Sequence, residues 1–216
     1  MSPISPRDPV VLVHGLWMRG HEMALLRRRL QRDHGFDVHV FSYPTLFGDT
    51  AQITADLADF AEGVAAGRLV HFVGHSLGGT FVLRALERYP ARFDGNAVLL
   101  AAPLNGCKAA CGVLRWPMLR PIIGPHLLAE VSAPAEHHWQ GPAALGAIAG
   151  TRRLGMGQFF AGFHEDHDGT VAVSETIIPG LADHLVLPHS HMGMLTAGDV
   201  ADQVAHFLRH AAFRRS

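Results

Sequence analysis

The sequence has few cysteines, almost no net charge and no long apolar run, and each of these features excludes a class of protein. Among 216 residues only Cys107 and Cys111 are cysteines, too few for the disulfide framework of an exported protein. No apolar run is long enough to cross a bilayer. The first nine residues also lack the pattern of a signal peptide. We therefore expect reduced thiols, a cytoplasmic location and no stable membrane insertion.

Charge and length narrow the choice further. The chain carries 18 basic and 19 acidic side chains, which gives a formal net charge of −1. That balance does not indicate nucleic acid or an anionic membrane surface as a partner. An apolar share of 48% agrees with a soluble globular protein, and the length suits one domain with a substantial core. We expect a single domain over residues 1–216.

Short apolar runs alternate with stretches of helical spacing along most of the chain. Buried strands are expected at residues 9–15, 37–43, 68–73, 96–102, 144–150 and 185–188. Helices are expected through about residue 33, from about 49 to 67, over 80–88, and from 196, where Thr196–Asp199 resembles a capping box. This alternation predicts an α/β fold, a three-layer sandwich with a parallel central sheet and helices on both faces.

The most informative stretch is Gly74-His75-Ser76-Leu77-Gly78, which lies between an expected strand and an expected helix. In a G-x-S-x-G turn the serine backbone is strained, and the flanking glycines let strand and helix pass closely. The turn raises the Ser76 hydroxyl at the carboxyl end of the sheet and favours its use as a nucleophile. The alternative, a turn that only lets two elements pack, leaves Ser76 unexplained.

A serine hydroxyl needs a histidine base to attack a carbonyl, and that base needs a carboxylate to fix its tautomer. On this topology the acid and then the histidine follow the serine, each on a loop after a later strand. His191, in Ser190-His191-Met192-Gly193, comes after the last expected strand and before the last helix. We expect His191 to be the base, with His184 and His189 as alternatives.

For the acid, we expect Asp168. The glycine that follows it permits a tight turn beside an inward-pointing side chain, and Glu165 and Asp166 are nearby alternatives. Two backbone donors should stabilise an oxyanion near the serine. The N–H groups of Leu77 and of Leu16 are the candidates.

Two further residues are candidates for the substrate pocket, namely Trp17 and His75. Trp17 directly follows the expected oxyanion residue, although an aromatic side chain there fits a core position equally well. Residues 103–142 also form an unusually long connection that contains six prolines, which exclude one long helix. We interpret about 104–143 as a small cap over the active site; the alternative is a crossover helix with a decorated surface loop.

Taken together, these motifs resemble the α/β-hydrolase superfamily, in particular its small bacterial lipase and esterase-like members. They occur in the expected order from about residue 9 to residue 210. The resemblance implies an open sheet of about six mostly parallel strands, and hydrolysis of carboxylic esters through an acyl-enzyme. It also implies a small-molecule or lipid-like ester as substrate, with no cofactor and no metal.

Three other functions stay open. The same triad serves thioesters, amides and acyl transfer, and fold analogy does not choose the acyl group. A metallohydrolase is a second possibility, in which imidazoles and a carboxylate activate water; its candidate ligands are His164, His167, Asp168, His189 and His191. A non-catalytic binding module that keeps the fold is the third.

Overall fold

A parallel six-stranded sheet forms the centre of the molecule, which we describe from a computed structural model covering residues 8–116, 118, 124, 137–155 and 157–215. The strand order is β2-β1-β3-β4-β5-β6, and every neighbouring pair is parallel. The strands are β1 (Pro9–Val13), β2 (Asp37–Phe41), β3 (His71–His75), β4 (Ala97–Leu100), β5 (Leu145–Gly150) and β6 (Asp183–Leu187). The predicted fold class is confirmed.

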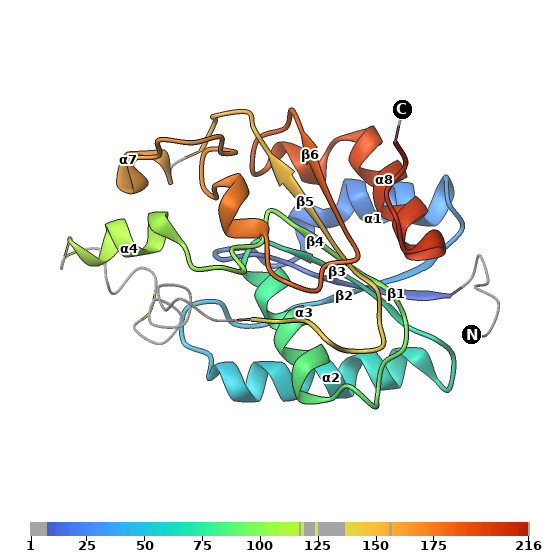
Figure 1. The fold of residues 1–216 in the computed structure, drawn as a ribbon. Helices are drawn as coiled ribbons and strands as arrows, with labels where there is room; N and C mark the ends of the chain where they lie inside the picture. Colours follow the sequence, from blue (N-terminus) through green and yellow to red (C-terminus); the bar gives the residue numbers. More distant parts are fainter. Residues whose placement is uncertain (1–7, 117, 119–123, 125–136, 156, 216) are drawn as a thin grey trace.

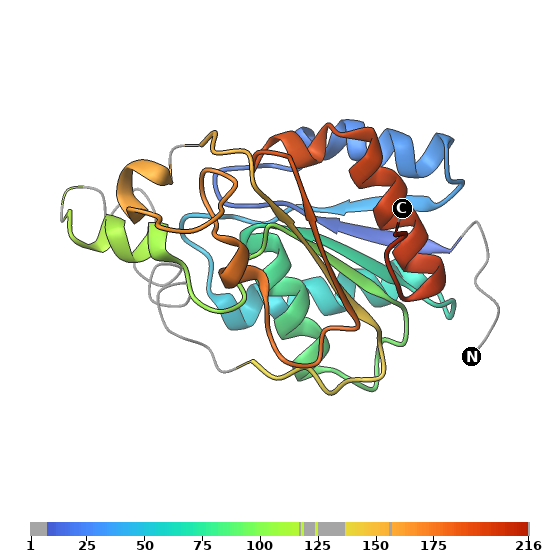
Figure 2. The same cartoon turned by 45° about the horizontal axis from the view of Figure 1, so that its top comes forward.

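Helices cover both faces of the sheet (Figures 1 and 2). One face carries α2 (Thr50–Ala65) and α3 (Leu77–Arg88), and the other carries α1 (Ala24–Arg32) and α8 (Gly198–His210). Each face has its own apolar core, because side chains alternate from one side of a strand to the other. Thus Val11 and Phe72 pack toward α2 and α3, whereas Val10 and Val73 pack toward α1 and α8. No helix in the described part of the chain is both long and apolar enough to span a bilayer.

Short elements gather at the carboxyl end of the sheet. There α4 (Lys108–Leu114) lies beside α7 (Gln158–Ala161) (Figures 1 and 2). The remaining short helices are η1 (His21–Met23), η3 (Val173–Thr176) and η4 (Gly193–Leu195). The predicted cap at 104–143 contains α4, but 117, 119–123 and 125–136 lie outside the described residues, so the cap remains a prediction.

The start of the last helix differs from the expected capping box. The N-cap residue of α8 is Ala197, which has no side chain that could accept a hydrogen bond. Thr196 instead donates its hydroxyl to the Gly193 carbonyl at 3.0 Å, and the Asp199 carboxylate binds the His189 ring at 2.8 Å. Thr196 therefore bonds a residue outside the helix, and Asp199 bonds His189 and the N–H of its neighbour Val200.

Candidate active site

Ser76 occupies a strained turn between β3 and α3. Its φ of 53° and ψ of −125° lie in a region that side-chain-bearing residues rarely adopt. Glycines make the turn possible: a Cβ on Gly74 would lie 2.5 Å from the Gly79 Cα. A Cβ on Gly78 would overlap the backbone oxygens of Val13 and His14 in the neighbouring strand and loop. The G-x-S-x-G pattern is therefore a packing requirement that leaves the serine at the end of the central strand.

Asp168 and His191 form a buried hydrogen-bonded pair. His191 Nδ1 donates to Asp168 Oδ2 at 2.7 Å, and the two residues are 1% (Asp168) and 8% (His191) exposed. The other carboxylate oxygen accepts the N–H groups of Thr170 and Val171, both at 2.8 Å. Burial alone would raise the pKa of Asp168, but the charge of His191 and these hydrogen bonds together hold it below its usual value. Asp168 is therefore an ionised acceptor that fixes the His191 tautomer.

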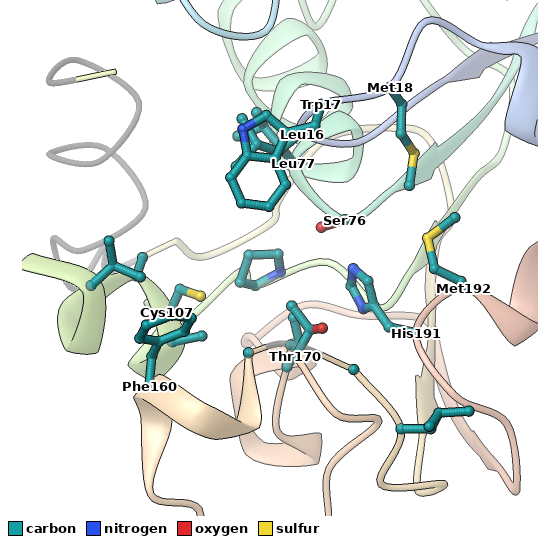
Figure 3. Close-up of a pocket in the computed structure, with 18 residues that line it drawn as sticks. Leu16, Trp17, Met18, Ser76, Leu77, Cys107, Phe160, Thr170, His191 and Met192 are labelled. Carbon is teal, nitrogen blue, oxygen red and sulfur yellow. The ribbon is translucent and has the colours of Figure 1, made fainter. Parts of the chain in front are cut away.

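Ser76 and His191 face the same pocket, which has a volume of about 370 Å³ (Figure 3). Figure 3 shows the Ser76 oxygen between the Leu16–Met18 loop on one side and Phe160 and Thr170 on the other. No hydrogen bond joins Ser76 Oγ to His191 within the described residues. Such contacts are commonly loose before substrate binds.

The two expected oxyanion donors lie beside Ser76. Leu77 is the first residue of α3, so its N–H has no acceptor within the helix. Leu16 lies in the loop after β1, and both leucines line the pocket. The structure thus places both residues where the motif predicts them.

A histidine and a tyrosine hold the Leu16 loop in place. The His14 ring stacks on Tyr43 with ring centroids 4.5 Å apart, and Tyr43 donates its hydroxyl to the His14 carbonyl at 2.7 Å. The Tyr43 N–H donates to His14 Nε2, so Nδ1 carries the proton and donates to the Gly15 carbonyl at 3.0 Å. Burial lowers the pKa of His14, which keeps the ring neutral. Tyr43 was not predicted from the sequence; it lies in the segment just after β2.

Of the two predicted pocket residues, only Trp17 lines the pocket. Its side chain is 50% exposed, and its N–H donates to Thr45 Oγ1 at 3.2 Å. His75 is a correction: its ring is fully buried and contacts His191 from behind the pocket. As the last residue of β3 it points into the protein, so neighbouring Ser76 in the sequence did not bring it to the substrate surface.

Several pocket residues were not predicted. They are apolar side chains contributed by separate segments: Met18, Val113, Leu154, Phe160 and Met192. Met192 follows His191 directly, which is the one signal in the sequence that could have found it. The others depend on how distant loops pack.

The alternative bases and acids are engaged elsewhere. His184 binds the Thr176 hydroxyl at 2.8 Å, and His189 binds Asp199. Glu165 forms an ion pair with Lys108, and Asp166 lies 3.5 Å from Arg153. None of the four contacts the Asp168–His191 pair through a hydrogen bond or ion pair in the described residues, so the structure brings together only the preferred acid and base.

Of the candidate metal ligands, Asp168 and His191 bind each other, and the others lie elsewhere. His167 accepts the Gly169 N–H at 3.1 Å and stacks on Phe163, away from the His189–Asp199 pair. No group of three histidine, cysteine or carboxylate side chains in the described residues could hold a metal ion. The donor set of the metallohydrolase alternative is therefore dispersed.

Both cysteines are free thiols, and one of them lies in the pocket wall. Burial raises the pKa of the Cys107 thiol to about 12, so the thiol stays protonated near neutral pH. Cys111 is exposed. Because the thiolate is the nucleophilic form, Cys107 does not compete with Ser76 as a nucleophile at that pH.

A parallel sheet with a glycine-flanked serine turn and a histidine–aspartate pair at its carboxyl end defines a class of α/β enzymes. The chain belongs to the alpha/beta hydrolase family, whose sequence profile matches residues 10–213. The family resemblance expected from the motifs is confirmed. No curated protein sequence gives a significant match.

Solved structures with the same fold come from several kinds of protein. The mature lipase BlEst2 of Bacillus licheniformis is 19% identical with a TM-score of 0.76, over 96% of this chain and 94% of that one. The metagenomic carboxyl esterase MGS0156 is 21% identical with a TM-score of 0.67, over 88% and 66%. The Vlm2 thioesterase domain is 14% identical with a TM-score of 0.61, over 98% and 96%. At these identities the likeness concerns the fold.

Proposed function

We propose that this protein is a serine hydrolase that cleaves carboxylic esters of apolar acids or alcohols through an acyl-enzyme. One observation carries the proposal: the strained Ser76 and His191, which is hydrogen-bonded to the buried Asp168, line the same apolar pocket. Ser76 is then the nucleophile, His191 the general acid and base, and Asp168 its orienting partner.

In the first half of the reaction Ser76 Oγ bonds to the ester carbonyl carbon while His191 Nε2 takes the hydroxyl proton. The negative charge on the carbonyl oxygen is held by the N–H groups of Leu16 and Leu77. His191 then gives the proton to the alkoxy oxygen, and the carbon–oxygen bond breaks. The alcohol leaves, and the acyl group stays on Ser76.

In the second half a water molecule replaces the alcohol. His191 takes one proton from the water as its oxygen bonds to the acyl carbon. The same proton is then delivered to Ser76 Oγ as the bond to the acyl group breaks. The products are a carboxylic acid and free enzyme.

The pocket wall supports an apolar substrate. Of the described residues that line it, only Ser76, Cys107, Thr170, His191 and the Trp17 indole have polar side-chain atoms, and none carries a permanent charge. A charged group would lose hydration there without an opposite charge as compensation. A small-molecule or lipid-like ester fits this surface better than a charged one.

A chain-length series of p-nitrophenyl esters tests the proposal. We expect turnover by the wild type and none by Ser76→Ala, with kcat/KM rising from acetate to longer acyl chains as more apolar surface is buried. Acyl thioesters with matched chains measure the thioesterase alternative in the same assay. Loss of turnover in EDTA would support a metallohydrolase instead, and no turnover of either substrate series would favour a binding module.

A further inference from the structure

His75 is a buried histidine that the proposed reaction does not use. Its ring is fully buried at the end of β3, directly before Ser76. Its Nε2 lies 2.9 Å from the His191 carbonyl oxygen, and the two rings are 4.7 Å apart with planes inclined at 49°. A side chain of the nucleophile strand therefore reaches the loop that carries the base.

The contacts of His75 define its tautomer. A carbonyl oxygen only accepts, so Nε2 of His75 carries the proton and donates it to His191. The other nitrogen, Nδ1, is buried with no hydrogen-bond partner in the described residues. A second proton on Nδ1 would be buried without an acceptor, which disfavours the cation.

Within the described residues, three hydrogen bonds then hold His191. Asp168 provides two of them, because its carboxylate accepts from Nδ1 at 2.7 Å and its carbonyl accepts the His191 N–H at 3.0 Å. His75 provides the third at the His191 carbonyl. The bonds from Asp168 connect His191 to the loop that carries the acid, and in the described residues only the bond from His75 connects it directly to β3, the strand that precedes Ser76.

We propose that His75 is a positioning residue that fixes the His191 imidazole relative to the Ser76 hydroxyl through its hydrogen bond to the His191 backbone. A general base works only within hydrogen-bond reach of its proton. A displacement of about 1 Å at a reacting group costs on the order of 100-fold in rate. His75 thus links the end of β3 directly to the loop that carries His191.

The charge state of His75 suits this role. Burial lowers the pKa of His75 to about 3, and the His191 ring lowers it as well. Its hydrogen bond to the His191 carbonyl and the Asp168 carboxylate raise the pKa, while His14 lowers it slightly. A neutral ring does not repel the imidazolium that forms on His191 during each half-reaction.

Two substitutions of His75 by amide side chains distinguish a positioning role of this residue from a role in packing. In His75→Gln the side-chain amide reaches about as far as the histidine Nε2, whereas in His75→Asn it reaches only about as far as Nδ1. The inference rests on the proposed function, so active sites are first titrated with a fluorophosphonate. Rates are then expressed per titrated site with p-nitrophenyl butyrate, and melting temperatures are measured for each protein.

We expect kcat per titrated site to fall about 10- to 100-fold in His75→Asn and to stay within about threefold of the wild type in His75→Gln. KM should change little, because His75 does not line the pocket. The rate of fluorophosphonate labelling should fall by the same factor as kcat. His75→Leu, an apolar side chain without a donor, gives the same comparison if His75→Asn does not fold.

Two results would overturn the inference. One is equal kcat per site in the Gln and Asn variants, or in the Gln and Leu variants. The other is a loss that follows the melting temperature and disappears once rates are corrected for titrated sites. A wild type that does not react with fluorophosphonate would instead refute the proposed function.

Discussion

The two sides of the candidate active site differ in burial and in what they require of their side chains. The rear side, made of His75, Asp168 and His191, is at most 8% exposed, and three hydrogen bonds hold its base. The front side, which lines the pocket, includes Trp17 and Leu154, which are 50% and 62% exposed. Rear positions require particular donors and acceptors, whereas front positions require only apolar surface of a suitable shape. The proposed chemistry is thus separated from the choice of substrate.

The largest effect is expected at the nucleophile, where the two sides meet. Ser76→Ala should lower kcat by several orders of magnitude, up to about 10⁶-fold. The fold should be unchanged, because the Ser76 hydroxyl makes no hydrogen bond in the described residues. Ester hydrolysis and thermal unfolding of both proteins check this. If the Ser76→Ala variant retained a tenth of the activity, the nucleophile would have to be another residue.

The next largest effect is expected on the rear side from Asp168→Asn, a substitution that leaves the side-chain volume almost unchanged. Asp168→Asn removes the charge that orients His191, so kcat should fall about 10³- to 10⁴-fold near neutral pH. Because the pKa of Asp168 is held below its usual 3.8, this carboxylate should stay ionised in the wild type from pH 5 to 9. Steady-state kinetics from pH 5 to 9 measure both. A loss below tenfold would contradict the role of Asp168.

His71, at the other end of β3, is a buried histidine outside the candidate active site. Burial lowers the pKa of His71 to about 4, against about 6.5 in an unfolded chain. Between these values only the unfolded state gains the proton, so the free energy of unfolding falls as the pH drops from 6.5 to 4. The loss is on the order of 3 kcal/mol.

Urea unfolding at several pH values measures this loss. His71→Asn keeps an acceptor near the position of Nδ1, which accepts the Asn96 N–H at 2.9 Å, and it removes the titration. The pH dependence of the variant should therefore be shallower than that of the wild type. Parallel curves would show that His71 titrates equally in both states.

The smallest effect is expected on the front side. Phe160 lines the pocket, and its neighbour Phe159 is 79% exposed and does not. Phe160→Ala should lower kcat/KM for long-chain esters about tenfold and for acetate less, while Phe159→Ala should change neither. Kinetics with both esters measure the difference. Equal effects of the two substitutions would contradict the assigned pocket wall.

Of the rear side, Asp168 and His191 could be predicted from the sequence, and so could Ser76, where the two sides meet. Gly74 and Gly78 mark a turn in which any Cβ would collide with backbone, so the motif alone locates Ser76. The alternation of strands and helices fixes which loops meet at the carboxyl end of the sheet. That order selected Asp168 and His191, and the structure brings the two together.

The misplaced and missed residues share one physical reason. His75 adjoins Ser76 in the chain, yet alternation along a strand turns its ring away from the pocket. Tyr43 is 29 residues from His14, and only the pairing of β1 with β2 brings the two rings together. The Asp199 carboxylate binds His189 instead of completing a helix cap. Each outcome depends on a partner that local sequence does not reveal.

The most direct test of the central claim is to map the site of covalent attachment by a fluorophosphonate. The labelled protein would be digested and its peptides examined by mass spectrometry. The account predicts one adduct, on Ser76, absent from Ser76→Ala and formed far more slowly in Asp168→Asn. Attachment at another residue, or an enzyme that hydrolyses esters while remaining unlabelled, would contradict it.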